Sequence, residues 1–207
     1  MNSRTQRLQL QAGAGAVEAL LDAPDGVTPR GVALIAHPHP LFGGTMDNKV
    51  VQTIARAFVQ CGWTAVRFNF RGVGASAGSH DEGRAEAQDM QSLIEQVAPA
   101  GPLALAGFSF GAFVTTQVVA CLWSVRPPEK IVLVGTAVTR FATPPLPPEA
   151  HERSLVIHGE QDDTVALAAV LDWARPQSLP VTVVPGVEHF FHGQLPLLKS
   201  LVVRHLR

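Results

Sequence analysis

The 207-residue sequence has no excess of either charge, since 16 Lys and Arg side chains stand against 17 Asp and Glu side chains. It also has no basic run with interleaved aromatic residues. Proteins that bind a polyanion present such a basic surface, so nothing indicates a nucleic-acid partner. We expect the partner to be a small molecule instead.

The sequence contains no apolar run of the roughly 18 residues that would span a bilayer. The first residues, Met1 to Arg7, lead into an alternating pattern rather than into the apolar core of a signal peptide. We therefore expect a cytoplasmic location and no membrane partner.

Cysteine is scarce, because the sequence holds only Cys61 and Cys121. Each comes near the end of a helical pattern, and neither has Cys or His neighbours at the spacing of a metal site. We interpret both as buried or half-buried free thiols. Neither a metal ion nor an organic cofactor is expected.

The hydrophobic content of 46% and the length of the chain are sufficient for one full core. The sequence shows no internal repeat and no low-complexity tract. We expect a single domain over residues 1–207, with no prediction of its oligomeric state.

Apolar runs of strand length alternate with helical patterns along the chain. An antiparallel hairpin is expected over residues 8–21. The other predicted strands span residues 31–36, 63–70, 103–106, 130–135, 154–158 and 181–184, and the predicted helices span residues 47–61, 82–97, 112–122, 164–174 and 194–207. This alternation predicts an α/β fold with a mostly parallel central sheet of about seven to eight strands, flanked by helices. In such sheets, ligands bind beyond the carboxyl ends of the strands.

One strand-end segment, Gly107-Phe108-Ser109-Phe110-Gly111, joins an apolar run to a helical pattern. Two glycines flanking a serine at this spacing indicate a tight turn at which strand and helix backbones approach closely. The turn would lift the Ser109 hydroxyl clear of the sheet edge. A serine hydroxyl needs an adjacent base and a group that orients that base before it becomes a good nucleophile.

Two later strand-end loops carry acids and histidines. The acid loop, residues 158–165, contains Glu160, Asp162 and Asp163, and the loop of residues 185–193 contains His189 and His192. The order along the chain is therefore serine, acid, histidine.

The chain resembles the α/β-hydrolase superfamily in its GxSxG turn at residues 107–111, its HGxxDxxV acid loop and its late histidine. Residues 37–45, HPHPLFGGT, residues 67–74, RFNFRGVG, and the GFSFG turn resemble a branch of small lidless bacterial serine hydrolases. The resemblance extends from Gly31 to Gly193. It implies an α/β-hydrolase fold without a lid domain.

The resemblance also implies roles for single residues. Ser109 matches the nucleophile, Asp162 the acid and His189 the base. Asp163 competes for the acid position, with Glu160 behind it, but the motif spacing favours Asp162. His192 competes with His189 on the same loop.

Two backbone N–H groups are implied as donors to the oxyanion of an acyl-transfer reaction. The first belongs to Phe110, which follows the nucleophile. The second comes from the loop after residues 31–36, where His37-Pro38 replaces the family's usual His-Gly pair. We assign it to His39, with Leu41 in reserve, because a proline has no N–H to donate.

Apolar residues at the strand ends are expected to wall an acyl pocket. They are Leu41, Phe42, Val138, Phe141 and Phe190. Arg71 is expected to brace its own loop or the nearby Asp81 and Glu82 rather than to bind substrate. His80, His151 and His205 are expected to be solvated, and His158 to shape the acid loop.

These implied roles predict a serine hydrolase that cleaves a carboxylic ester or thioester of a small substrate through an acyl-enzyme on Ser109. The alternatives are a peptidase or amidase with the same residues, or a non-catalytic binding module of the same fold. Since no insertion is long enough for a lid, we expect an open pocket that takes short or medium acyl chains.

Overall fold

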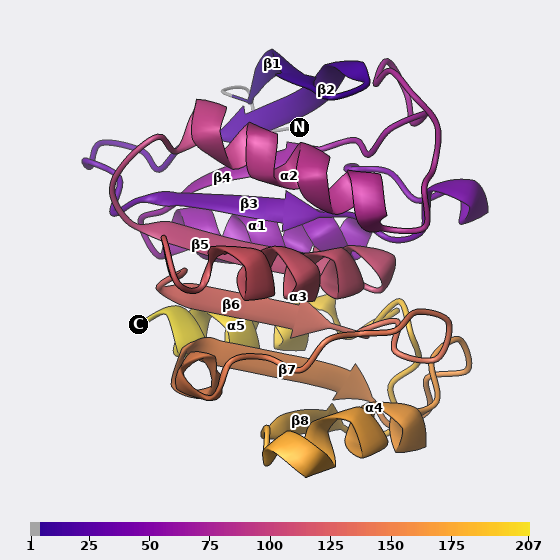
Figure 1. Ribbon diagram of the computed structural model, residues 1–207. Coiled ribbons are helices and arrows are strands. Elements are labelled where there is room, and N and C mark those ends of the chain that lie inside the picture. The colour runs from indigo at the N-terminus through magenta and orange to yellow at the C-terminus, as the bar shows by residue number, and fades with distance from the viewer. Residues whose placement is uncertain (1–4) are drawn as a thin grey trace.

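The computed structural model describes residues 5–207 (Figure 1). Residues 1–4 lie outside the described residues. The prediction that Met1 to Arg7 do not lead into a signal peptide falls partly on them. Eight strands form one sheet in the order β1-β2-β4-β3-β5-β6-β7-β8. The strands are β1 (Gln6–Ala12), β2 (Gly15–Asp22), β3 (Val32–Ala36), β4 (Thr64–Phe68), β5 (Leu103–Phe108), β6 (Lys130–Val134), β7 (Ser154–Gly159) and β8 (Val181–Val184).

The sheet is mostly parallel, as the sequence predicts. Strands β3 to β8 all run in one direction, and the β1–β2 hairpin lies at one edge, with β2 antiparallel to β4. The central strands are buried along nearly their whole length, which accounts for their mostly apolar sequences. Their carboxyl ends meet at one edge, on the right in Figure 1.

Helices cover both faces of the sheet (Figure 1). They are α1 (Lys49–Gln60), α2 (Arg84–Val97), α3 (Phe110–Leu122), α4 (Leu167–Ala174) and α5 (Leu195–Leu206), with short 3₁₀ helices η1 (Pro40–Phe42), η2 (Pro148–Arg153) and η3 (Arg175–Gln177). Helices α1 and α5 pack on one face and α2, α3 and α4 on the other. The core is therefore two apolar layers, one on each side of the sheet.

Several elements begin or end a few residues away from their predicted bounds, and three of these differences lie next to the site described below. Strand β4 ends at Phe68, because the Asn69 N–H donates to the Glu18 carbonyl and the Phe70 N–H to a histidine ring. Helix α4 begins at Leu167 rather than at residue 164, because the preceding N–H groups donate to a carboxylate of the acid loop. Helix α3 begins two residues early, directly after Ser109.

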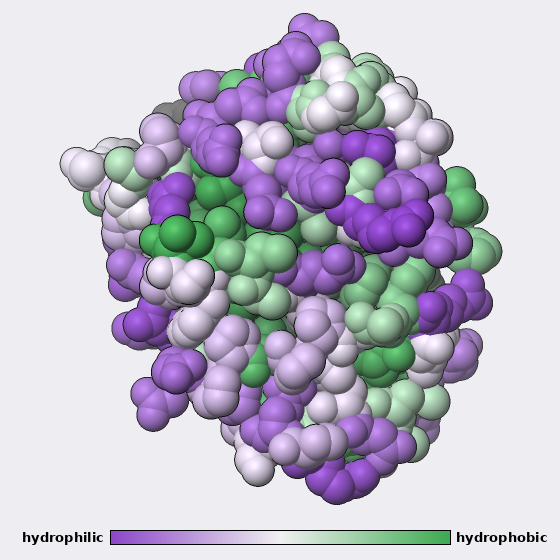
Figure 2. All heavy atoms as spheres, viewed as in Figure 1, coloured by the Kyte–Doolittle hydropathy of each residue, from purple (hydrophilic) through white to green (hydrophobic). Residues whose placement is uncertain are grey.

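The surface is polar over the outer side of α2 and apolar in smaller areas (Figure 2). Hydrophobic side chains project at the right edge of Figure 2, where η1 lies in Figure 1. The large exposed residues of η1 are Leu41 and Phe42, each 71% exposed. An exposed apolar pair at the carboxyl edge of the sheet marks that edge as a candidate site.

Within residues 5–207, no helix combines the length and the apolar character needed to cross a membrane. The expected cytoplasmic location stays a prediction. Cys61 is a half-buried free thiol, as expected, whereas Cys121 is exposed. The prediction for Cys121 is wrong because this residue lies on the solvent side of the last turn of α3.

Candidate active site

Ser109 lies at the apex of the turn between β5 and α3, with a φ of 57° and a ψ of −116°. A positive φ is unfavourable for a residue with a side chain and persists only where the surroundings enforce it. A Cβ on Gly107 would lie 2.2 Å from the Gly111 carbonyl oxygen, and a Cβ on Gly111 would lie 2.4 Å from that of Ala36. Both glycines are thus required by the close approach of the backbones.

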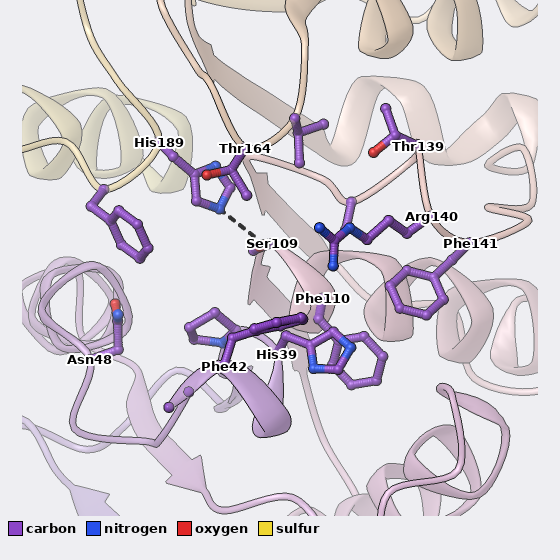
Figure 3. A pocket seen from close by; sticks show the side chains of 16 residues that line it. His39, Phe42, Asn48, Ser109, Phe110, Thr139, Arg140, Phe141, Thr164 and His189 are labelled. Atoms are coloured by element: carbon purple, nitrogen blue, oxygen red, sulfur yellow. Dashed lines mark hydrogen bonds between the residues drawn. The ribbon is translucent and has the colours of Figure 1, made fainter.

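A chain of hydrogen bonds connects Ser109 to the loops after β7 and β8. Figure 3 shows its first bond, between Ser109 and His189. The Ser109 hydroxyl lies 3.0 Å from Nε2 of His189, and Nδ1 of His189 lies 2.6 Å from Oδ2 of Asp162. Because a carboxylate only accepts, His189 donates its Nδ1 proton to Asp162 and accepts the Ser109 hydroxyl through Nε2. All three residues are buried.

The acid loop is folded around the Asp162 carboxylate. Its Oδ1 accepts the N–H groups of Thr164 at 3.0 Å and Val165 at 2.7 Å. Burial alone would raise the pKa of Asp162, but the hydrogen bonds from His189 and the Val165 N–H lower it below its usual range. Asp162 is therefore held as a carboxylate at neutral pH.

The competing acids of the loop are directed elsewhere. Asp163 is exposed, and the exposed Glu160 accepts the Gly186 N–H at 2.8 Å. His158 lies beneath the loop, where its Nε2–H donates to the Val165 carbonyl at 2.8 Å. Burial lowers the pKa of His158, so it remains neutral.

The competing histidine, His192, has a side chain that is 75% exposed and lies 3.1 Å from Glu188. The same carboxylate accepts the N–H groups of Phe190 at 2.8 Å and His192 at 2.6 Å. Glu188 thus orders the loop that presents His189, while His192 faces solvent.

His37 is fully buried directly after β3, with hydrogen bonds at both ring nitrogens. Its Nε2 accepts the Phe70 N–H at 3.0 Å, so Nδ1 carries the proton and donates to the Pro38 carbonyl at 2.6 Å. Burial lowers the pKa of His37 to about 4, which keeps this neutral form. Gly44 packs against the same carbonyl, since a Cβ there would lie 2.1 Å from the Pro38 oxygen.

The Pro38–His39 peptide is fixed by this arrangement. In a trans peptide the N–H points away from the C=O, so anchoring the Pro38 oxygen also sets the direction of the His39 N–H. Within residues 5–207, neither the His39 nor the Phe110 N–H donates to a protein acceptor. The Leu41 N–H, the reserve donor, donates to Nδ1 of His39 at 3.2 Å. The structure therefore disfavours Leu41 as the oxyanion donor.

A cavity of about 310 Å³ opens above Ser109. It is lined by Pro38, His39, Phe42, Gly43, Gly44, Asn48, Ser109, Phe110, Ala137, Thr139, Arg140, Phe141, Thr164, Val165, His189 and Phe190. Of the five predicted pocket residues, Phe42, Phe141 and Phe190 are in this lining. Asn48, Thr139 and Arg140 also line the cavity and were not predicted from the sequence, although Arg140 lies between the predicted Val138 and Phe141.

The predictions for Leu41 and Val138 as pocket residues are wrong. Leu41 lies in η1 with 71% of its surface exposed, outside the cavity that Phe42 lines. Val138 packs instead against the hydrophobic core on the α2 and α3 side of the sheet. Adjacent residues of a short turn point in different directions, and neither direction is encoded in a simple apolar pattern.

His80 is not solvated, contrary to the prediction. Its side chain is 10% exposed and its Nδ1 lies 3.0 Å from the fully buried Glu86. The ring centroids of His80 lie 4.7 Å from His39 and 5.2 Å from Phe110. His80 therefore packs against His39 and Phe110, which line the cavity.

The predictions for His151 and His205 are wrong as well, since both are half-buried. His205 donates through Nε2 to the Arg153 carbonyl at 3.1 Å, and burial, followed by the charge of Lys130, lowers its pKa to about 4. Both lie away from the cavity lining.

Arg71 braces its loop, but its partner is Asp89 of α2 rather than Asp81 or Glu82. Its Nε and an Nη donate to the two Asp89 oxygens at 2.8 and 2.9 Å. This bidentate pair raises the pKa of Arg71 and leaves no donor pair directed at the cavity. In the described part of the chain, no three His, Cys, Asp or Glu side chains are grouped so as to hold a metal ion.

The chain is similar to several known proteins. The sequence profile of a family described as "Serine aminopeptidase, S33" matches residues 28–151, more than half of the chain. An uncharacterised protein of Rickettsia prowazekii is 32% identical over 181 residues, which cover 77% of this chain and 71% of that protein.

Two solved structures are similar over nearly their whole length. One, from Xanthomonas campestris, is described as an α/β serine hydrolase without a lid. It has a TM-score of 0.86 and 34% identity, and the match covers 100% of this chain and 95% of that one. The other, an α/β serine hydrolase homologue from Coxiella burnetii, has a TM-score of 0.85 and 34% identity, with 98% and 97% covered.

Proposed function

The chain belongs to the S33 family of α/β serine hydrolases, in a branch without a lid, and on this premise we propose that it cleaves a carboxylic ester or thioester of a small molecule. The observation that carries the proposal is the hydrogen-bonded chain from Ser109 through His189 to Asp162, at the floor of an open cavity. Ser109 forms the acyl-enzyme in this mechanism.

In the first half-reaction, Oγ of Ser109 attacks the carbonyl carbon while its proton passes to Nε2 of His189. Asp162 stabilises the resulting imidazolium through the 2.6 Å contact with Nδ1. The tetrahedral intermediate collapses when the bond to the leaving group breaks, and Nε2 returns the proton to the departing alcohol or thiol. Ser109 is left acylated.

In the second half-reaction, a water molecule takes the place of the leaving group. His189 accepts its proton, the hydroxide attacks the acyl carbon, and collapse of the second intermediate releases the carboxylic acid. The proton on Nε2 returns to Ser109. The free enzyme is regenerated, and one water molecule has been consumed.

The N–H groups of Phe110 and His39 hold the oxyanion of both intermediates. A donor aimed at this charge contributes roughly 3–4 kcal/mol to the stability of the transition state. The Phe110 N–H also lies in the first turn of α3, where the helix dipole favours a negative charge. His37 acts as a positioning residue here, because it anchors the peptide that bears the His39 N–H.

Amide cleavage is the second candidate, and the family description as an aminopeptidase favours it. An aminopeptidase must hold the free ammonium group of its substrate, for which a carboxylate is the natural partner. Among the described residues that line the cavity there is no Asp or Glu, and Arg140 would repel an ammonium group. Ester or thioester cleavage therefore has the better support, and turnover of matched 4-nitrophenyl ester and 4-nitroanilide substrates compares the two.

The absence of a lid favours short or medium acyl chains, since the cavity of about 310 Å³ at the surface offers little apolar area to a long one. A series of 4-nitrophenyl esters of increasing acyl length tests this point. An optimum on long chains would contradict it.

Active-site labelling tests the proposed function. A fluorophosphonate probe is expected to label the wild-type protein at one site and to leave the Ser109→Ala variant unlabelled. Circular dichroism of the variant provides the control for folding. Labelling that persists in Ser109→Ala contradicts the site, and a folded wild-type protein that does not label favours a binding module instead.

A further inference from the structure

Arg140 is the only Lys or Arg in the lining of the cavity within the described chain, and the lining holds no Asp or Glu. Its guanidinium carbon lies 5.1 Å from the centroid of the Phe42 ring, in a cation–π contact across the rim. A cation stacked on an aromatic face keeps its N–H donors free at its edge. Arg140 therefore presents donors and a positive charge at an otherwise largely apolar mouth.

No described carboxylate lies within ion-pair distance of Arg140. The acids of the nearby α2 start are occupied, because Asp81 pairs with Arg84 at 3.0 Å, and Glu86 accepts the Asp81 and Gly83 N–H groups. Glu82 lines a second hollow that Arg140 and Phe141 also line, and no ion pair joins Glu82 to Arg140. The charge of Arg140 is thus not neutralised by the protein.

The positions of Arg140 and His189 indicate where the acyl group and the leaving group of a substrate lie. In Figure 3 the two side chains lie on opposite sides of Ser109, and the Arg140 guanidinium points toward the cavity beside Phe110. The leaving group must lie beside Nε2 of His189, because that atom protonates it. The acyl group consequently extends toward Arg140.

We propose that Arg140 binds a carboxylate on the acyl part of the substrate, so that the preferred substrates are half-esters or half-thioesters of short dicarboxylic acids. This inference rests on the proposed function, since it assigns the acyl group of that reaction. Phe141 contacts the methylene groups of the acyl chain, and the guanidinium holds its far end through paired N–H donors. Phe42 holds the guanidinium in place from the other side.

Two 4-nitrophenyl esters of adipic acid test the proposal, because they have the same chain and differ only in a free or a methyl-capped distal carboxyl. The wild-type protein is expected to show kcat/KM about five- to tenfold higher for the free carboxylate, mainly through a lower KM. Arg140→Gln is expected to abolish this ratio, chiefly by raising KM for the free carboxylate. Arg140→Lys should retain part of the ratio, since a lysine supplies charge without the planar fork.

Arg56→Gln is the matched control, because it removes the same charge from an exposed site on α1 outside the cavity. It should leave the ratio unchanged. In the wild-type protein the ratio should also shrink at 1 M salt, where the screening length falls to about 3 Å.

The outcomes separate this inference from the function on which it rests. Turnover of the capped ester without any preference for the free carboxylate, or a preference that persists in Arg140→Gln, overturns the inference and leaves the hydrolase proposal standing. If neither ester is turned over and Ser109 does not react with the fluorophosphonate, the proposed function fails and the inference with it.

Discussion

Ser109, His189 and Asp162 at the floor of the cavity are each at most 7% exposed, whereas Phe42 at the rim is 71% exposed and Arg140 is exposed as well. Floor residues are fixed by several hydrogen bonds each. Rim residues are held by one another, through a ring and a guanidinium 5.1 Å apart. The floor therefore has one geometry and the rim has room to adapt.

Because of this difference, substitutions at the floor and at the rim should change different kinetic constants. Preorganised groups at the floor act on the transition state, so their loss should lower kcat. Groups at the rim bind ground state and transition state alike, so their loss should raise KM and leave kcat nearly unchanged. The following predictions test that division, and a rim variant that lowers kcat as strongly as a floor variant would break it.

Asp162→Asn has the largest expected effect among these substitutions. An amide would donate to His189 in place of accepting from it, which reverses the histidine tautomer and removes the base that Ser109 needs. We expect kcat to fall by about 10⁴-fold on a 4-nitrophenyl ester. Asp163→Asn, the exposed neighbour, is the matched control and should retain wild-type kcat; equal losses in the two variants would contradict the assignment of the acid.

Two substitutions of His37 separate its two hydrogen bonds. His37→Asn places an amide N–H near the position of Nδ1 and preserves the donor to the Pro38 carbonyl, while His37→Gln places its amide near Nε2 and loses that donor. We expect His37→Gln to lower kcat by about 10²-fold more than His37→Asn does, with similar KM. Equal kcat values for the two variants would show that the anchored carbonyl does not orient the His39 N–H.

His37 should also make the folded protein sensitive to acid. Its pKa is about 4 in the folded protein and about 6.5 when unfolded, so between these values the unfolded chain binds the proton and the folded chain does not. Stability is therefore complete above pH 6.5 and falls as the pH drops toward 4, by about 3 kcal/mol from this group. His205 adds a similar loss, so the test is the difference between wild type and His37→Asn in urea unfolding at pH 7 and pH 4.5. The variant should lose less stability between the two pH values than the wild type.

Phe42→Ala has the smallest expected effect. Loss of an exposed ring at the rim should raise KM for a neutral ester by about three- to fivefold and leave kcat unchanged. Leu41→Ala is a stringent control, because Leu41 is equally exposed on the same 3₁₀ turn but lies outside the cavity. If both variants raise KM alike, the rim is a general apolar surface and not a wall of the site.

The floor could be predicted from the sequence to a greater extent than the rim. Ser109, Asp162 and His189 each follow a strand within a short motif, and the topology of a parallel sheet brings strand ends together. The structure places these three side chains within hydrogen-bond distance along one chain. Local motifs, the resemblance to the α/β-hydrolase superfamily and one topological rule together selected these residues.

The remaining features depend on contacts that a linear pattern does not contain. His37 appears in a recognisable motif, but its role depends on the N–H of Phe70, 33 residues later in the chain. His80 is predicted to be solvated, whereas the fold places the buried Glu86 3.0 Å from its Nδ1. Arg140 followed a strand end like the predicted pocket residues, but only the structure shows that no described carboxylate neutralises it.

Trapping the acyl-enzyme is the most direct test of the central claim that Ser109 is the nucleophile of an ester hydrolase. Wild-type protein would be mixed with a 4-nitrophenyl ester, quenched in acid within milliseconds and examined by mass spectrometry after proteolysis. We predict a mass increase equal to one acyl group on the peptide that contains Ser109, and its absence in Ser109→Ala. Rapid ester hydrolysis by the wild-type protein with no adduct, or with the adduct on another residue, would contradict the account.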